Sequence, residues 1–343
     1  MTESPLRKGW TTGACAAAAA KAAYAALRGE GFPDPVTIQL PRGETPSFAL
    51  SRKHLEPCRA IAGVIKDAGD DPDVTHGAEI IATVEPGSAG SGITFRAGEG
   101  VGTVTLPGLP IPPGEPAINP GPRRQITDNL GDVDLVVTIS IPGGEALAAK
   151  TLNSRLGIMG GLSILGTTGV VIPYSCSAWV HSIHRGVDVA RALGFDHVAG
   201  VTGKTSEALA RKRLGLSDQA IIDMGDMAGG LLKYLRRAPV RRLTLVGGFA
   251  KLTKLAAGHL DLHSAASQVD GGFLGGLLRD LGFADQLPLS ATAAQALVLA
   301  GDLPLGDLVA RRARETALAV LSGGTEIAVI AVDRGGKVVG KSG

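Results

Sequence analysis

The sequence predicts a two-domain protein of the α/β plus α+β class. It places a mixed-sheet α+β domain over residues 1–150 and an α/β domain over residues 151–321. Short strand-like segments follow one alanine-rich helix in the first part of the chain, and strands alternate with helices from about residue 170. A chain of 343 residues is also long enough to bury two cores.

The first predicted element is a helix that extends to about residue 27. Its run ACAAAAAKAAYAAL has alanine at nearly every position, and Thr11 or Thr12 can cap its N-terminus. The seven prolines of residues 106–124 predict an ordered, extended connection. Strands separated by glycine and proline turns are predicted at residues 36–40, 47–51, 78–85, 92–98 and 134–142.

The second predicted domain has the alternation of strands and helices that is typical of a parallel sheet. The segments VVIPYS, HVAGVTG, AIIDMGD and RRLTLVGG are predicted strands, and a helix-forming segment follows each of them. Strands that alternate with helices in this way form βαβ units, so we expect a Rossmann-like parallel sheet with helices on its faces. Residues 322–343 contain a predicted β-hairpin that turns at residues 333–336 and can complete the first domain.

Composition and charge exclude several classes of protein. Lys and Arg number 34 against 32 Asp and Glu, and aromatic residues make up 3%, which disfavours nucleic-acid binding. The three cysteines are far apart and residues 1–10 lack an apolar signal segment, so we expect a cytoplasmic protein. The uncharged segment 156–184 contains Pro173 and five glycines in residues 157–169, which argues against a membrane span.

The sequence Gly-Thr-Thr-Gly at residues 166–169 lies in this glycine-rich segment. Thr167 and Thr168 offer two hydroxyl groups among backbone amides that glycine leaves accessible. We interpret the segment as part of a small-molecule site. The alternative is that its glycines only relieve packing between neighbouring elements.

A second candidate site is the acidic loop at residues 66–77, KDAGDDPDVTHG. Its four aspartates repel one another unless a cation, a cationic cofactor or arginines lie among them. The loop lacks the glycine and the final glutamate of an EF-hand, which disfavours calcium. Its acid–base candidates are Asp67, Asp71 and His76. The alternative is a solvated acidic turn.

The loops after the predicted parallel strands form a third candidate site, because ligands bind beyond the carboxyl ends of such strands. Gly203-Lys204-Thr205 matches the end of a phosphate loop, but that pattern requires a glycine where Val198 stands, which disfavours a nucleotide phosphate site. The loops that we expect at one crevice are residues 173–175, 202–204, 223–226 and 247–249.

Two histidine pairs have a spacing that places both rings near one another on a helix. No third ligand is evident near either pair, so we expect no metal site. His263 is a better candidate for a contact to a substrate than for a metal ligand. The pairs are His181 with His184 and His259 with His263.

Three arginines lie close to turns rich in glycine or proline. Arg7, Arg123 and Arg155 have this placement, which suits the binding of several carboxylates because a guanidinium pairs with a carboxylate through two hydrogen bonds. The alternative is that they are ordinary surface arginines.

Many of the candidate residues fall within five long motifs that occur in order along most of the chain. The motifs are LRKGWTTGACAAAAAKAA (6–23), KDAGDDPDVTHG (66–77), GVGTVTLPGLPIPPGEPAINPGPR (100–123), NSRLGIMGGLSILGTTGVVIPYS (153–175) and GGFAKLTKLAAGHLDLHS (247–264). Together they resemble the cobalt-precorrin-5B C(1)-methyltransferases of cobalamin biosynthesis. The chain departs from that family at Ala14, where threonine is common, and in the Gly-Gly-Phe-Ala loop before Lys251.

The resemblance implies an S-adenosylmethionine-dependent C-methyltransferase that methylates C1 of a ring-contracted corrinoid precursor to give precorrin-6A. S-adenosylmethionine is then the co-substrate, and the expected partner is a flat tetrapyrrole polycarboxylate rather than a nucleic acid or a membrane. The implied step is a direct displacement in which the enzyme mainly aligns the reactants. The need for a general base stays open, and Asp71 or His76 is the candidate if one acts. The presence of cobalt in the substrate, the domain that binds the donor and a homo-oligomeric state stay open. The alternatives are a non-catalytic corrinoid carrier and a magnesium-dependent phosphotransferase.

Under this resemblance each candidate residue receives a role. The catalytic candidates are Asp67, Asp71 and His76, and the carboxylates of their loop can also offset the positive charge of the donor sulfonium. The expected substrate-binding residues are Arg7, Thr11, Thr12, Gly13, Arg123, Arg155, Thr167, Thr168 and His263. The expected donor-binding residues, with a carboxylate for the ribose diol, are Thr202, Gly203, Asp223, Gly225, Asp226, Gly247 and Gly248.

Overall fold

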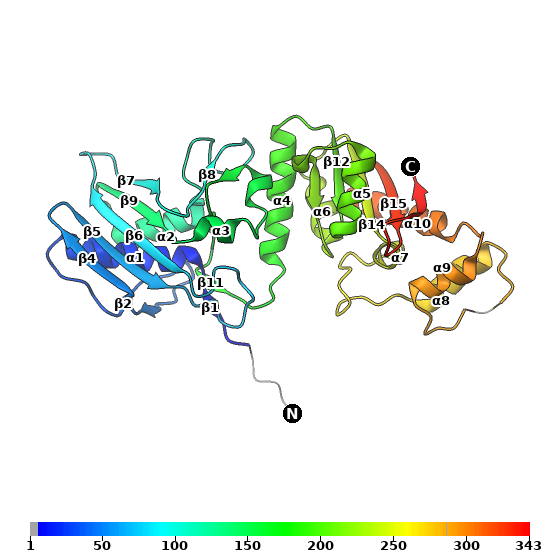
Figure 1. Cartoon of the computed structure of the whole chain (residues 1–343), viewed down its shortest axis with the longest axis horizontal. Coiled ribbons are helices and arrows are strands. Elements are labelled where there is room, and N and C mark those ends of the chain that lie inside the picture. Colours follow the sequence, from blue (N-terminus) through cyan, green and yellow to red (C-terminus); the bar gives the residue numbers. More distant parts are fainter. Residues whose placement is uncertain (1–5, 286) are drawn as a thin grey trace, which may run out of the picture. The chain divides into compact units, whose positions relative to one another are not determined.

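The computed structural model describes residues 6–285 and 287–343, and the chain divides into two compact units (Figure 1). The units are residues 1–175 and 176–343, so the boundary follows residue 175 and not residue 150 as we expected. Residues 151–175 belong to the first unit because two of their strands pair with strands of that unit. Strand β10 (Ile158–Met159) pairs with β8 (Thr103–Val104), and β11 (Val170–Val171) pairs with β1 (Gly9–Trp10).

The first unit contains a five-stranded mixed sheet. Its order is β4-β5-β6-β9-β7, in which only β7 and β9 are parallel neighbours. Strands β2 (Val36–Thr37) and β3 (Ser47–Phe48) form a separate two-stranded sheet in the same unit. This is the α+β arrangement that the sequence predicts. The main strands are β4 (Arg52–Glu56), β5 (Arg59–Ile65), β6 (Glu79–Pro86), β7 (Ile93–Ala97) and β9 (Leu135–Ser140).

Helix α1 (Thr12–Leu27) is the alanine-rich helix that the sequence predicts. The Thr11 hydroxyl caps it by accepting a hydrogen bond from Ala14 N at 3.2 Å. The helix packs against β5, β6 and helix α2 (Pro120–Leu130), and its alanines are buried because their small side chains allow close approach. The expected extended connection at 106–124 is therefore wrong at its end, where Pro120 stands at the first helical position, which tolerates proline. The short helices α3 (Gly144–Ala148) and η1 (Asn153–Leu156) follow β9.

The second unit is built on a five-stranded sheet of order β13-β12-β14-β15-β16. Strands β12, β13 and β14 are parallel, as the alternation of strands and helices predicts. Strand β15 is also parallel to β14, and β16 is antiparallel. The predicted C-terminal hairpin is present, but β15 pairs with β14, so the hairpin does not complete the first domain. The segment VVIPYS contributes no strand to this sheet, because β11 pairs with β1. The strands are β12 (His197–Val201), β13 (Ile221–Asp223), β14 (Arg242–Gly248), β15 (Glu326–Val332) and β16 (Val338–Ser342).

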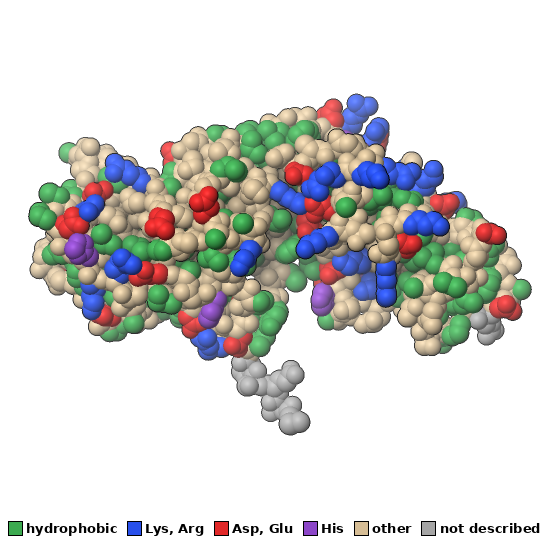
Figure 2. Space-filling model, in the orientation of Figure 1, with side chains coloured by type: hydrophobic (Ala, Val, Ile, Leu, Met, Phe, Trp, Pro, Cys, Tyr) green, Lys and Arg blue, Asp and Glu red, His purple; other side chains and the backbone are tan. Residues whose placement is uncertain are grey.

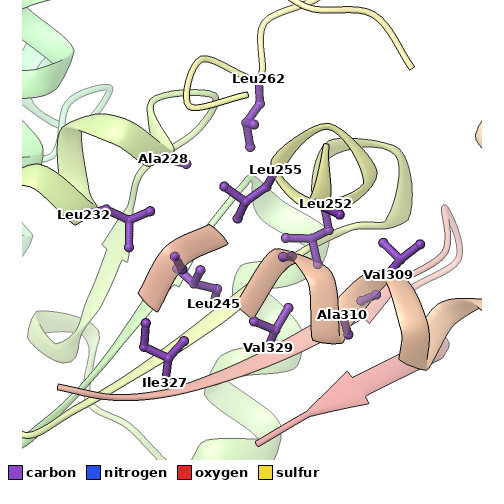
Figure 3. Close-up of a cluster of buried hydrophobic side chains, with 14 of the residues drawn as sticks. Ala228, Leu232, Leu245, Leu252, Leu255, Leu262, Val309, Ala310, Ile327 and Val329 are labelled. Atoms are coloured by element: carbon purple, nitrogen blue, oxygen red, sulfur yellow. The ribbon is translucent and has the colours of Figure 1, made fainter. Parts of the chain in front are cut away.

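The core of the second unit forms where helices pack on this sheet. Figure 3 shows apolar side chains of β14 and β15, among them Leu245 and Ile327, facing side chains of the helices, among them Leu252 and Val309. The helices are α4 (Ser177–Ala192), α5 (Lys204–Leu214), η2 (Asp218–Ala220), α6 (Ala228–Leu235), α7 (Phe249–Ala256), α8 (Gly271–Asp280), α9 (Ala293–Ala300) and α10 (Leu305–Leu321).

The surface reflects the near-neutral composition. On the face drawn in Figure 2, acidic and basic side chains are interspersed with exposed apolar ones. Within the described ranges no helix has the length and apolar character that crossing a membrane requires.

Candidate functional site

The first candidate site is a place in the first unit where three chain segments meet. We call it the loop cluster and define it as residues 6–13, 66–77 and 165–175. The backbone N–H of Trp10 donates to Asp67 O at 2.7 Å, that of Thr11 to Gly169 O at 2.9 Å, and that of Gly13 to Leu165 O at 3.0 Å. Glycine at position 9 permits this approach, since a Cβ there would overlap the backbone of residue 68. Three predicted site segments thus come together.

The negative charge of Asp67 is balanced by an ion pair with Arg7. The guanidinium of Arg7 donates to both carboxylate oxygens of Asp67, with 2.9 Å between Nη2 and Oδ1, and the Arg7 N–H donates to Asp70 Oδ2 at 2.6 Å. The hydrogen bond from Arg7, helped by one from the Gly69 N–H, lowers the pKa of Asp67 to about 2. Such a carboxylate is ionised at neutral pH and is a weak base, which makes it a poor proton acceptor in catalysis.

The base of the acidic loop is fixed by a buried ion pair. The Lys66 side chain is 1% exposed, and its Nζ lies 2.5 Å from Asp73 Oδ2. Asp73 Oδ1 also accepts hydrogen bonds from the N–H and the hydroxyl of Thr75. Burial raises the pKa of Asp73, but the Lys66 charge and these hydrogen bonds outweigh burial and leave the pKa below its usual value. This pair holds the loop in shape.

The other two catalytic candidates hold backbone amides. Asp71 Oδ1 accepts a hydrogen bond from the Tyr174 N–H at 2.8 Å. His76 Nδ1 accepts one from the Ala68 N–H at 3.1 Å, which assigns the ring proton of the neutral histidine to Nε2. Both residues therefore organise the loop cluster, and the imidazole of His76 is exposed.

The threonines of the loop cluster differ in accessibility. Thr12 is buried in the first turn of α1, and the Thr168 hydroxyl is bonded to the backbone of Val170. Thr167 is exposed. The buried Gln125 side chain fixes this turn by donating from Nε2 to Gly166 O at 2.6 Å. Of the predicted threonine contacts, Thr167 is thus the one that solvent and ligands reach most easily.

Arg123 is held within the protein. Its Nε donates to Ile118 O at 2.8 Å, its Nη2 lies 3.2 Å from Glu115 Oε2, and its guanidinium lies over the Phe95 ring at 5.3 Å. These contacts give it a structural role at the start of α2. Arg155 lies in η1 of the same unit.

The second candidate site lies in the second unit at the carboxyl ends of β12, β13 and β14. We call it the strand-end site. Lys251 joins the three loops: its Nζ donates to Thr202 O at 2.8 Å and lies 3.0 Å from Asp226 Oδ1. The Gly248 N–H donates to the Thr202 hydroxyl at 3.3 Å. The strand ends bring together all the residues that we predicted to bind the donor, namely Thr202, Gly203, Asp223, Gly225, Asp226, Gly247 and Gly248.

Sequence reasoning missed two residues of the strand-end site. Lys251 was detectable, because it stands three residues after the end of β14 in a helix that begins at the sheet edge. Trp179 was not detectable, because it lies far from the strand-end loops in sequence. A Cβ built on Gly225 would lie 3.3 Å from the indole Nε1 of Trp179 and 3.4 Å from two further ring atoms. The indole therefore covers the loop after β13 while the residue stays 44% exposed.

The structure places two of the predicted site segments away from the residues that we expected beside them. Loop 173–175 lies in the first unit, so only three of the four expected loops form the strand-end site. His263 lies in the second unit, where its N–H donates to Asp261 Oδ1 and its Nδ1 accepts from the Ala265 N–H. It is near the strand-end site in the fold, because the Leu262 N–H donates to Asp226 O at 2.8 Å.

His184, a member of one of the two histidine pairs, packs on an aromatic ring. His184 stacks on Tyr234, with 4.0 Å between ring centroids and 12° between planes, and the Tyr234 hydroxyl donates to Asp188 at 2.6 Å. Among residues 6–285 and 287–343, the structure has no group of three or more His, Cys, Asp or Glu side chains placed to hold a metal ion.

Comparison with known proteins gives one family over the whole chain. The family profile CbiD matches residues 1–173, and the profile described as CbiD, C-terminal domain, matches residues 261–343. Proteins named cobalt-precorrin-5B C(1)-methyltransferase are similar over nearly their full length. The one from Paramagnetospirillum magneticum is 58% identical and covers 98% of both chains, and the one from Brucella anthropi is 56% identical over 99% of this chain and 96% of its own.

A solved structure is also similar. The crystal structure of the cobalamin biosynthesis protein (cbiD) from Archaeoglobus fulgidus is 30% identical in sequence, covers 75% of this chain and 82% of its own, and has a TM-score of 0.40. The matches to these curated relatives cover residues of both units. This chain therefore belongs to the CbiD family.

Proposed function

We propose that this chain transfers a methyl group from S-adenosylmethionine to C1 of cobalt-precorrin-5B in cobalamin biosynthesis. The observation that carries the proposal is the 58% identity over 98% of the chain to a relative named for this reaction. The two candidate sites also have the chemistry that the two substrates require.

The strand-end site fits the methyl donor, a nucleoside with an amino-acid tail. Carboxylates at the ends of parallel strands can accept hydrogen bonds from a ribose diol, and Asp223 and Asp226 stand there. Gly203 and Gly248 leave open space, because a Cβ at either position would meet no atom within 4 Å. Lys251 fixes the loop geometry by contacting Thr202 and Asp226. When bound, S-adenosylmethionine supplies an electrophilic methyl group on its sulfonium.

The loop cluster fits the tetrapyrrole. Its Arg7 is occupied by Asp67, so the exposed Lys8 next to it is a better cation for a carboxylate of the substrate. Methylation at C1 creates a quaternary carbon without loss of a proton there, so the reaction needs no base. This agrees with the lowered pKa of Asp67. Alignment of the reactants is then the main contribution of the protein, worth up to about 7–11 kcal/mol when the geometry is good.

Calorimetric titration with adenosylhomocysteine, the demethylated donor, tests the donor site. We expect micromolar binding to the unchanged chain and at least about tenfold weaker binding, roughly 1.4 kcal/mol, for Asp226→Asn and Lys251→Met. Asp218→Asn is the matched control, because Asp218 is an exposed carboxylate of the same unit that pairs with Arg211. Equal binding by all four proteins would remove the strand-end site from the proposal.

Turnover tests the reaction itself. Incubation with cobalt-precorrin-5B and S-adenosylmethionine should give a product one methyl group heavier, detected by mass spectrometry, with the label of a methyl-labelled donor. A corrinoid carrier would bind the tetrapyrrole, show no affinity for adenosylhomocysteine and release no methylated product. That result would replace methyl transfer by the carrier function.

A further inference from the structure

Tyr174 has a backbone conformation that tyrosine rarely adopts. Its φ is +57°, in the left-handed region that favours glycine. Among the described non-glycine residues only Ser322 shares a positive φ, and Ser322 closes the C-terminus of α10, where this conformation is common. Tyr174 closes no helix and lies in the loop between β11 and α4, at the third position of a turn that the Ser175 N–H closes by donating to Ile172 O at 3.2 Å. A type II turn takes a positive φ at this position, but its usual residue there is glycine or asparagine and not tyrosine. The strain at Tyr174 therefore has no explanation in the helix ends.

Burial does not compensate this strain. Tyr174 is 67% exposed, so its ring gains little from the hydrophobic effect. Glycine at this position would adopt the same φ without strain. Strained backbone on an exposed bulky residue is typical of functional positions, where the conformation serves to present a side chain.

Asp71 supports Tyr174 in this conformation, together with the turn bond from the Ser175 N–H to Ile172 O. Its Oδ1 accepts the Tyr174 N–H at 2.8 Å across a separation of 103 residues. Asp71 belongs to the acidic loop, whose base is fixed by the buried pair of Lys66 and Asp73. The chain thus uses a rigid loop to position the backbone of one exposed tyrosine.

The surroundings of Tyr174 combine apolar side chains with a cation. Ile172 is 55% exposed, and Leu6 at the other side of Arg7 is 56% exposed. Because Gly9 pairs with Val171 in the antiparallel ladder of β1 and β11, Lys8 and Ile172 lie at the same end of that ladder. The Arg7 N–H donates to Asp70, next to Asp71, which brings residue 6 to the same region. An exposed aromatic ring, aliphatic neighbours and a lysine are complementary to a flat conjugated ring that carries carboxylates at its edge.

We propose that Tyr174 contacts the substrate, with the conjugated face of the tetrapyrrole resting on its exposed ring, and that Asp71 is a positioning residue that acts through Tyr174. This inference rests on the proposed function and assigns residues to its substrate. It replaces the acid–base role that the sequence suggested for Asp71. The oxygen of Asp71 works as a hydrogen-bond acceptor for one amide, and the phenol ring supplies the contact.

Binding of a stable corrin tests the contact. We would titrate the full chain with dicyanocobyrinic acid, a corrin that keeps its side-chain carboxylates, and follow binding by calorimetry. Tyr174→Leu should weaken binding at least tenfold, and Tyr174→Phe should bind within about threefold of the unchanged chain, since it keeps the ring. Leu55→Ala is the matched control, because Leu55 is 52% exposed on the same unit and lies on the hairpin of β4 and β5.

Thermal unfolding distinguishes a role of Tyr174 in binding the substrate from a role in stabilising the fold. Tyr174→Gly removes the strain, so its Tm should equal or exceed that of the unchanged chain while its affinity for the corrin falls as in Tyr174→Leu. A Tm several degrees lower would show that the tyrosine serves the fold and would overturn the proposal.

Two variants of Asp71 test the positioning role. Asp71→Ala removes the acceptor of the Tyr174 amide and should weaken corrin binding severalfold, whereas Asp71→Asn keeps an amide oxygen and should bind nearly as the unchanged chain does. In a Tyr174→Gly background, Asp71→Ala should have no further effect. If Asp71→Asn is as impaired as Asp71→Ala, the charge of Asp71 matters and the positioning role is wrong.

The outcomes for the inference and for the proposed function are distinct. If the unchanged chain binds the corrin and Tyr174→Leu binds it equally well, the inference fails while the proposed methyl transfer stands. If the unchanged chain binds adenosylhomocysteine but no corrin, the loop cluster is excluded as the substrate site and the inference falls with it.

Discussion

At the scale of single residues, the acidic loop shows how the protein's own donors stabilise a cluster of carboxylates. The Arg7 side chain pairs with Asp67, the Arg7 N–H with Asp70, Lys66 with Asp73, and the Tyr174 N–H with Asp71. Each carboxylate therefore has its own donor, and the repulsion among the four aspartates is offset locally. Such a loop can serve as a rigid support for neighbouring segments.

The lowered pKa of Asp67 predicts a pH dependence of stability. Because the folded-state pKa is depressed to about 2, the pair with Arg7 stabilises the fold above about pH 4 and loses this effect as the pH falls toward 2. Asp67→Asn should therefore have a lower Tm than the unchanged chain at pH 6, and the gap should close as the pH decreases. Melting curves from pH 7 to pH 3 measure it, with Asp132→Asn, an exposed carboxylate outside the loop, as control. A gap that does not vary with pH would contradict the assignment.

The buried pair of Lys66 and Asp73 predicts an asymmetric effect on stability. Asp73→Ala leaves a buried ammonium without a partner and should reduce the free energy of unfolding by about 3–5 kcal/mol. Lys66→Met places an apolar chain in the same space and should cost less, and the double variant should recover part of the loss. Denaturant titration measures these values. Lys53→Met, which breaks an exposed pair with Asp34, is the control and should change little.

At the scale of elements, glycine lets helix α10 lie directly on strand β16. A Cβ at Gly306 would overlap the backbone of Val339, and one at Gly340 would overlap the backbone of Gly306. The helix therefore approaches the edge of the second sheet with no side chain between the two backbones. This contact holds the C-terminal hairpin in the second unit, together with the pairing of β15 and β14.

This packing predicts opposite effects of the same substitution in two helices. Gly306→Ala should destabilise the second unit by about 1–3 kcal/mol or more, because the backbones must separate. Gly276→Ala in α8 is the matched control: its nearest atom is 3.9 Å away on the flexible Arg279 side chain, so the added methyl should stabilise the helix by about 0.5–1 kcal/mol. Chemical denaturation of both variants tests the pair of predictions. A tolerated Gly306→Ala would contradict the close contact.

At the scale of the whole molecule, the chain has two units with separate cores. The core of the first unit is centred on α1 and the mixed sheet, and that of the second on β14, β15 and the helices around them. Each unit contains one tryptophan, Trp10 in the first and Trp179 in the second. The two units can therefore be followed separately by fluorescence.

Ligand-induced stabilisation should identify the unit that binds the donor. In Trp10→Phe, Trp179 reports on the second unit, and in Trp179→Phe, Trp10 reports on the first. Adenosylhomocysteine at 100 times its Kd should stabilise the second unit by about 2.7 kcal/mol and leave the melting of the first unit nearly unchanged. Thermal melts with and without the ligand measure the shifts. A shift seen only by Trp10 would place the donor in the loop cluster instead.

Much of the fold was predictable because its signals are local. The alanine-rich run and its threonine cap predicted α1, and the alternation of strands and helices predicted the parallel strands β12, β13 and β14. Strands β4 and β5 were missed because their segments contain charged and small residues in place of a clear alternation. Helix α2 was missed because two prolines at its start resemble an extended connection.

The sequence by itself determined the elements with strong local signals, the near-neutral charge balance and, through its long motifs, the family. Only the tertiary structure decided which partners the site residues have. Arg7 meets Asp67 across 60 residues and Asp71 meets Tyr174 across 103, and no periodicity or cap encodes such pairings. They arise when β1 pairs with β11 beside the acidic loop, because sheet pairing and backbone contact at glycine bring distant segments to one place. Long-range strand pairing also set the unit boundary, because β10 pairs with β8 and β11 with β1, and the pairing of β15 with β14 keeps the C-terminal hairpin in the second sheet.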